Sequence, residues 1–175
     1  QQWLEFASNS NKKIEEPYIF CYFLGPRRDI REQAVKLAEQ TGCKIVINPH
    51  MEEYRKADEG IGDYICYDLN PYDFVKLLSE AKYVCTDSFH GTVFSIITHC
   101  KFMTFYRELG QSTNSRIDSL LSTFGLTDRL YKGKIEDCLT EIDFDAVDNI
   151  LCEYRKESLS FFKDACSLAD KSGNE

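Results

Sequence analysis

Short apolar runs alternate along the chain with segments whose apolar residues recur at helical spacing. The first run, "PYIFCYFLG", is apolar at nearly every position, as in strands that are buried on both faces of a sheet. The predicted strands cover residues 17–25, 43–49, 64–69, 82–86 and 101–106. Parallel strands need crossover helices, so this alternation predicts an α/β fold, a Rossmann-like parallel sheet with helices on both faces.

Local signals indicate where the helices begin and end. Asp29 and Glu32 form a capping-box pattern at the start of a helix, and Gly42 ends that helix. Asn70 followed by Pro71 is an N-cap with proline at the first helical position. The other predicted helices cover residues 91–99, 115–124 and 144–170.

Two parts of the chain differ in composition. Residues 1–16 are a polar leading segment with a short helix around Trp3 and Phe6, and residues 17–175 form one domain that ends in a long helix. The length of 175 residues suits a single domain. Because the chain begins with Gln1 rather than Met, we expect a fragment of a longer protein, with any upstream targeting signal outside it.

The formal net charge of −8 argues against a nucleic acid or an anionic membrane as the main partner. A small anion remains compatible with this charge, because a few nearby cations outweigh the field of distant carboxylates. No apolar run reaches membrane-spanning length. We therefore expect no nucleic-acid partner and no membrane span.

The eight cysteines are spread almost evenly, without a C-x-x-C pair or a histidine at zinc-ligand spacing. Cys21, Cys66 and Cys85 lie inside predicted strands, where free cysteine behaves as a small apolar residue. We expect reduced, structural thiols in a cytoplasmic protein, with neither a metal site nor a cofactor.

The segment "TDSFHG" places hydrogen-bonding side chains where the fourth predicted strand feeds a helix. In parallel sheets ligands bind outside the carboxyl ends of the strands, and a helix N-terminus there binds phosphate or carboxylate. Ser88 can donate a hydrogen bond, His90 can bind an anion or transfer a proton, and Gly91 lets a ligand approach the backbone. The residues alone leave a second interpretation open, in which Asp87 or Ser88 only caps the helix and His90 is structural. In the functional interpretation too, Asp87 is expected to be structural, either capping the helix or accepting hydrogen bonds from loop N–H groups.

Two separated motifs carry a resemblance to a known family. The first is "NPYDFVKLLSEAKYVCTDSFHGTVFSIITHCKFMTFYRE", and "NSRIDSLLSTFGLTDRL" follows it. In this order they resemble the polysaccharide pyruvyl transferase family, and the resemblance covers residues 17–131. It implies two Rossmann-like domains that face a cleft, as in GT-B glycosyltransferases. This chain then corresponds to the C-terminal half of such an enzyme, and the N-terminal domain is absent from it.

The resemblance also implies a reaction. A pyruvyl group passes from phosphoenolpyruvate to a pair of glycan hydroxyls, and a pyruvate ketal and phosphate are the products. The acceptor is a glycan or a lipid-linked sugar in bacterial exopolysaccharide biosynthesis. His90 is the expected catalytic residue, and Ser88, Gly91 and Thr92 are expected to bind the substrate.

The sequence departs from the family pattern at one position. Some members carry R-L-H where this chain has Ser88, Phe89 and His90, so the donor-binding arginine of those members has no counterpart. Arg116 in "NSRI" or Arg107 in "FYRE" is expected to replace it as a substrate-binding residue.

Two other functions remain open at this point. A GT-B glycosyltransferase would bind a nucleotide-sugar with this domain, and would need an acidic residue for the ribose and a pocket for the base. A non-catalytic module would use the same strand–helix junction only to hold an anion.

Overall fold

The computed structural model describes residues 2–50, 54–107 and 114–172, with side chains described as far as residue 166. The chain divides after Ile142 into two compact units, a sheet unit and a C-terminal helix.

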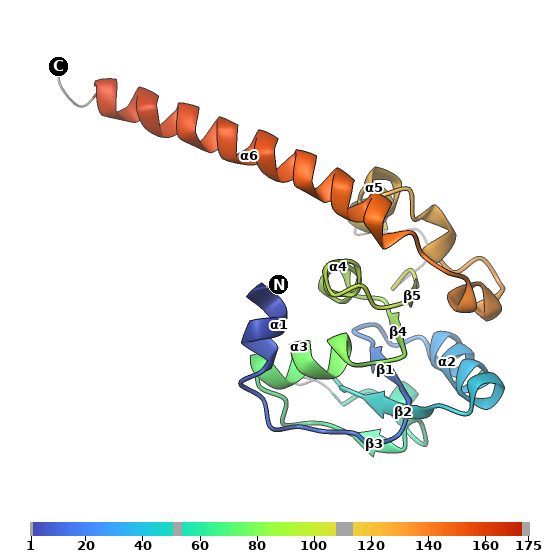
Figure 1. Ribbon diagram of the computed structural model, residues 1–175. Coiled ribbons are helices and arrows are strands. Elements are labelled where there is room, and N and C mark those ends of the chain that lie inside the picture. The colour runs from blue at the N-terminus through green and yellow to red at the C-terminus, as the bar shows by residue number, and fades with distance from the viewer. Residues whose placement is uncertain (1, 51–53, 108–113, 173–175) are drawn as a thin grey trace. The chain divides into compact units, whose positions relative to one another are not determined.

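The sheet unit is built on five parallel strands in the order β3-β2-β1-β4-β5 (Figure 1). The strands are β1 (Tyr18–Tyr22), β2 (Lys44–Ile47), β3 (Tyr64–Ile65), β4 (Tyr83–Thr86) and β5 (Phe102–Thr104). The chain moves outward in one direction from β1 to β2 and in the other from β4 to β5, so the order reverses between β1 and β4. That reversal is the place where open parallel sheets bind ligands.

One face of the sheet packs against helix α2 (Arg28–Thr41) and the 3-10 helix η3 (Ile135–Leu139). The strands and these two elements share one buried apolar core, because side chains two apart along a strand point to the same face. Members of this core are Ile19, Cys21, Ile45, Ile47, Cys85, Met103, Ile30, Ala34, Leu37 and Cys138.

The opposite face packs against helices α3 (Pro71–Ser79) and α4 (Phe89–Ile97). The ring of Phe74 in α3 lies edge-on to Phe20 and Tyr22 of β1, with ring centroids 5.6 and 5.0 Å away. Helices therefore cover both faces of a parallel sheet, and the fold predicted from the sequence is confirmed.

The short helix α1 (Gln2–Ala7) lies beside α3 in the sheet unit (Figure 1). The ring of Phe6 stacks at a tilt on Tyr72, with 4.3 Å between the centroids. Ser10, just after α1, donates a hydrogen bond of 2.5 Å to the buried carboxylate of Asp73. The leading segment is thus attached to α3 by both apolar and polar contacts.

Several predicted boundaries differ from the observed ones. The predicted capping box at Asp29 does not form, because α2 begins at Arg28 and Asp29 pairs with the Arg27 guanidinium instead. Helix α4 begins at Phe89, two residues earlier than predicted. Strand β3 is much shorter than the predicted run 64–69. Residues 50–62, for which the sequence predicts a polar loop with room for a helical turn, contain the 3-10 helix η1 (Lys56–Asp58), and positions 51–53 lie outside the described residues.

The remaining elements of the sheet unit follow β5. Helix α5 (Asn114–Thr123) is close to its predicted range, and the 3-10 helix η2 (Thr127–Arg129) comes next. Arg129 is buried and donates to the carbonyl of Asp137 at 2.9 Å. This bond fixes the chain between η2 and η3.

The C-terminal unit consists of helix α6 (Phe144–Ser172), the long helix that the sequence predicts. Its apolar side chains include Leu159, Phe161 and Phe162, which are exposed. Across the described part of the chain, no helix combines the length and the apolar character needed to cross a membrane.

All eight cysteines are described, and all are free thiols, as predicted. Five of them are buried in the sheet unit, where they serve as small apolar core residues.

Candidate functional site

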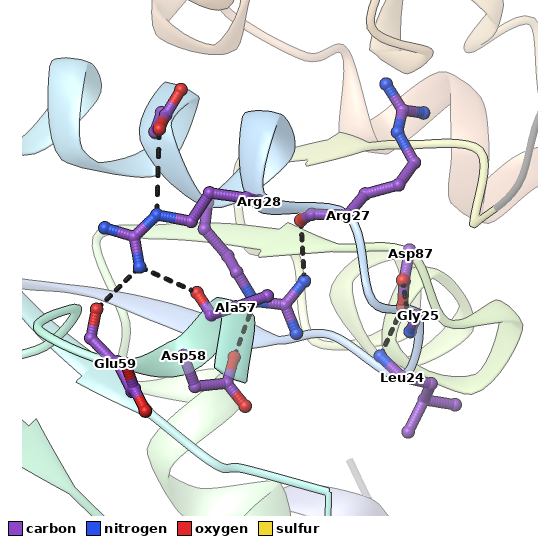
Figure 2. A network of polar contacts seen from close by, with 10 residues as sticks. Leu24, Gly25, Arg27, Arg28, Ala57, Asp58, Glu59 and Asp87 are labelled. Atoms are coloured by element: carbon purple, nitrogen blue, oxygen red, sulfur yellow. Dashed lines mark hydrogen bonds and ion pairs between the residues drawn. The ribbon is translucent and has the colours of Figure 1, made fainter. Parts of the chain in front are cut away.

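Asp87, directly after β4, joins the two loops that meet at the reversal of strand order. Its carboxylate is 1% exposed, and its two oxygens accept the backbone N–H groups of Leu24 at 2.7 Å and Gly25 at 2.8 Å (Figure 2). These two residues belong to the loop between β1 and α2. Asp87 therefore binds loop N–H groups, one of the two structural roles that its position suggested, and it does not cap α4.

Gly25 lies where three segments converge. A Cβ at this position would lie 2.9 Å from Oδ2 of Asp87 and 2.5 Å from Cγ of Arg107, which follows β5. Only glycine fits, because contacts this short do not occur at a real Cβ. The loops after β1, β4 and β5 are consequently packed together at the carboxyl edge of the sheet.

The environment of Asp87 acts on its protonation in two directions. Burial raises the pKa of the carboxyl, because the charged form loses hydration. The hydrogen bonds from Leu24 and Gly25 and the charges of Arg107 and Arg31 oppose this rise in pKa.

Ser88 is the N-cap of α4 and is 1% exposed. Its Oγ accepts the Gly91 N–H at 3.4 Å, and its carbonyl accepts the Thr92 hydroxyl at 3.0 Å. Thr92 is fully buried, and its Oγ1 lies 2.9 Å from Oγ1 of Thr104 in β5. Both hydroxyls that were expected to bind substrate are thus engaged inside the protein.

Gly91 is required for packing. A Cβ here would lie 2.5 Å from Oγ1 of Thr86, whose hydroxyl donates to the Tyr22 carbonyl at 2.6 Å and accepts the Ser88 N–H at 3.1 Å. This reason differs from the one expected from the sequence, which was close approach of a ligand. The glycine lets α4 lie directly against β4, and its N–H is taken by the cap.

His90 lies in the first turn of α4 with an exposed side chain. Its ring meets the Phe89 ring edge-on, with 5.8 Å between the centroids. The imidazole is therefore presented to solvent from the helix N-terminus, where the backbone N–H groups of the first turn carry a partial positive charge.

Arg116, in the first turn of α5, lies at the same junction. Its guanidinium carbon is 5.4 Å from the centroid of the Phe89 ring, within the range of a cation–π contact. Arg116, Arg107, Asp87 and Phe89 line one small pocket. The structure thus brings both candidate arginines to the strand–helix junction, while positions 108–113 between them lie outside the described residues.

A further buried arginine at this edge was not identified from the sequence. Arg31 is fully buried in α2, and its Nε donates to Asp58 at 2.5 Å while its Nη1 donates to the Arg27 carbonyl at 2.8 Å. The guanidinium also lies 5.0 Å from the centroid of the Phe23 ring. The sequence offers one sign of this arginine, because Arg31 directly follows Ile30, a residue of the apolar stripe of α2.

Metal binding has no support in the described parts of the chain. No three histidine, cysteine, aspartate or glutamate side chains among these residues are grouped as metal ligands.

Solved structures with a similar fold are only distantly related in sequence. The UDP-GlcNAc 2-epimerase of Methanocaldococcus jannaschii, in complex with UDP-GlcNAc and UDP, is 11% identical with a TM-score of 0.50. The match covers 89% of this chain and 51% of that one. The Neisseria meningitidis UDP-GlcNAc 2-epimerase is 13% identical, with a TM-score of 0.48 and coverage of 89% and 50%. The beta Kdo 2,4 transferase KpsC of Thermosulfurimonas dismutans is 13% identical, with a TM-score of 0.47 and coverage of 83% and 52%.

The chain spans about half the length of these structures. The similarity to the M. jannaschii epimerase supports the fold and nothing more. Among curated proteins, none is significantly similar to the chain.

One family model matches most of the sheet unit. It is the polysaccharide pyruvyl transferase model, and the match covers residues 3–108. The matched region contains all five strands, the Asp87 link between loops and the first turn of α4 with His90. The chain therefore belongs to the polysaccharide pyruvyl transferase family.

Proposed function

We propose that this chain carries the donor site of an enzyme that moves a pyruvyl group from phosphoenolpyruvate to two hydroxyls of a glycan. Family membership supports the reaction class. The observation that carries the location is the convergence of Arg116 and Arg107 on the first turn of α4. The alternative with a nucleotide-sugar donor has no comparable support among the described residues.

The donor requires two anion contacts, because phosphoenolpyruvate carries both a phosphate and a carboxylate. Arginine binds such groups through planar, bidentate hydrogen bonds. Arg116 takes the place of the arginine that this chain lacks at Ser88, and the N-terminus of α4 adds N–H groups that the helix does not use internally. Ser88 and Thr92 act indirectly, since their hydroxyls hold the turn that presents His90.

The proposed reaction balances without a cofactor. One acceptor hydroxyl loses its proton and adds to C2 of phosphoenolpyruvate. The C3 methylene of phosphoenolpyruvate gains a proton and becomes a methyl group. Phosphate then leaves C2, the second hydroxyl adds there, and its proton is released. His90 either protonates C3 or binds the phosphate as imidazolium, and both roles suit an exposed imidazole at a helix N-terminus.

The full enzyme is proposed to contain a second domain across a cleft from this one. The proposal follows the two-domain organisation that the family resemblance implies, and the match covers 51% of the M. jannaschii epimerase chain, which has a similar fold. The second domain and this one would enclose the glycan or lipid-linked acceptor, and we place the reaction in the cytoplasm.

The proposal is tested by measuring ketal formation from phosphoenolpyruvate with the full-length protein. His90→Ala should leave folding intact because the side chain is exposed, and should lower turnover by about two to four orders of magnitude. The matched control is His99→Asn, at the other end of α4. His99 is also exposed and has a φ of 58°, which asparagine tolerates. Equal turnover in the wild type and His90→Ala would remove His90 from the reaction.

A further inference from the structure

A second pocket lies at the carboxyl ends of β2 and β3, on the same edge of the sheet as the junction. It has a volume of about 100 Å³ and opens to solvent, so it is a shallow site that would hold one face of a small ligand. The side chains that matter for its chemistry are Tyr54, Tyr67, Ile65, His50, Arg55 and Asp58.

The apolar part of this pocket is unusually exposed. The exposed fractions are 75% for Tyr54, 61% for Tyr67 and 49% for Ile65. None of these side chains contributes to the buried core, so core packing does not explain three large apolar groups around one hollow. Exposed apolar groups gathered at one place are typical of binding sites, and aromatic rings supply flat apolar area with a polar hydroxyl at the edge.

The polar part of the pocket is held in place by buried contacts. Asp58 is fixed by the buried Arg31 at 2.5 Å. Arg28 donates to the backbone carbonyls of Ala57 at 3.1 Å and Glu59 at 2.6 Å, which fixes the wall of the pocket (Figure 2). The hydroxyl of Tyr54 donates to the carboxylate of Glu59. These contacts hold residues 57–59 of the wall in place, while positions 51–53 lie outside the described residues.

The polar groups also indicate the kind of ligand. Asp58 is ion-paired with Arg31, the Glu59 carboxylate accepts the Tyr54 hydroxyl, and Arg55 adds a positive charge. The pocket therefore presents charges of both signs and is not specific for a free anion or a free cation. A neutral ring with many hydroxyls is matched, because its hydroxyls both donate and accept and its apolar C–H face lies on a tyrosine ring.

We propose that this pocket binds a sugar residue of the glycan acceptor, beyond the residue that receives the pyruvyl group. This inference rests on the proposed function for the identity of the acceptor. Asp58 in the pocket is linked through Arg31 to the Arg27 carbonyl, and the same loop is held by Asp87 at the junction. A glycan that extends along this edge of the sheet would contact both sites.

Saturation-transfer difference NMR tests this assignment on the full-length protein without donor. The probes are the methyl glycosides of glucose, galactose, mannose and N-acetylglucosamine. Tyr67→Ala should raise the Kd of the bound glycoside by about 3- to 10-fold, the factor expected for loss of one aromatic contact. Tyr67→Phe keeps the ring and should bind as the wild type does. Tyr154→Ala, which removes a 51%-exposed tyrosine of α6, is the matched control and should change nothing.

Two results would overturn the assignment: no saturation transfer to any of the four glycosides, or the same Kd for Tyr67→Ala as for the wild type. Both are independent of the proposed reaction, because the measurement contains no phosphoenolpyruvate. If the wild-type protein forms no ketal from phosphoenolpyruvate, that result would instead contradict the proposed function.

Discussion

At the scale of single residues, Cys100 and Cys138 show how burial controls a titrating group. Burial raises the pKa of both thiols from 9.0 to about 12, because a thiolate in the core loses its hydration. The unfolded chain therefore loses these protons at a lower pH than the folded chain. Above pH 9 the unfolded state binds fewer protons, so the free energy of unfolding must fall as the pH rises.

This fall is the first prediction. Each such thiol should contribute a slope that approaches about 1.4 kcal/mol per pH unit between the two pKa values. Urea unfolding from pH 8 to 10 should show a shallower slope for Cys138→Ala than for the wild type. Cys152→Ala, which removes an exposed thiol of α6, should leave the slope unchanged. Parallel curves for Cys138→Ala and the wild type would mean that Cys138 ionises alike in both states.

The sequence does not predict the roles of residues whose partners are far away along the chain. The acid at 87 was correctly expected to be structural, but its partners Leu24 and Gly25 are more than sixty positions away. The pair Arg31 and Asp58 was missed for the same reason. Neither partner set has a local spacing rule, because each forms only when the strands are adjacent in the sheet.

At the scale of elements, helix α3 depends on a capping box at its start. Asn70 accepts the Asp73 N–H at 3.0 Å, and the Asp73 carboxylate accepts the Asn70 N–H at 3.4 Å. Asn70→Ala should lower the free energy of unfolding by about 1 kcal/mol. The measurement is chemical denaturation, with Asn149→Ala on the exposed side of α6 as control. An unchanged midpoint for Asn70→Ala would show that packing alone fixes the start of α3.

Helix starts also show where local rules succeed and fail. The start of α3 was predicted correctly because the N-cap Asn70 and the proline after it are adjacent in the sequence, and the structure adds the Asp73 carboxylate as the second half of a capping box. The start of α2 was not, because Arg27 competes for the Asp29 carboxylate and the N-cap has no side-chain bond. The start of α4 was placed too late, because the helix was expected to begin at Gly91, whereas Ser88 is the N-cap and Gly91 lies inside the helix against Thr86.

At the scale of the whole molecule, alternation of strands and helices was enough to predict the sheet. The position of the candidate site then follows from topology, because the reversal between β1 and β4 lies at the Asp87 junction. The convergence of Arg116 on this junction brings together a segment after β5 and the first turn of α4. The central claim is that this convergence forms the donor site.

Isothermal titration of the full-length protein with phosphoenolpyruvate tests that claim most directly. Arg116→Ala removes a charged hydrogen bond worth about 1.5–3 kcal/mol, so the Kd should rise by about 10- to 150-fold. Arg155→Ala, an exposed arginine of α6, should bind phosphoenolpyruvate as the wild type does. An unchanged Kd for Arg116→Ala, or binding of UDP- or GDP-sugars in place of phosphoenolpyruvate, would contradict the assignment of this junction as the donor site.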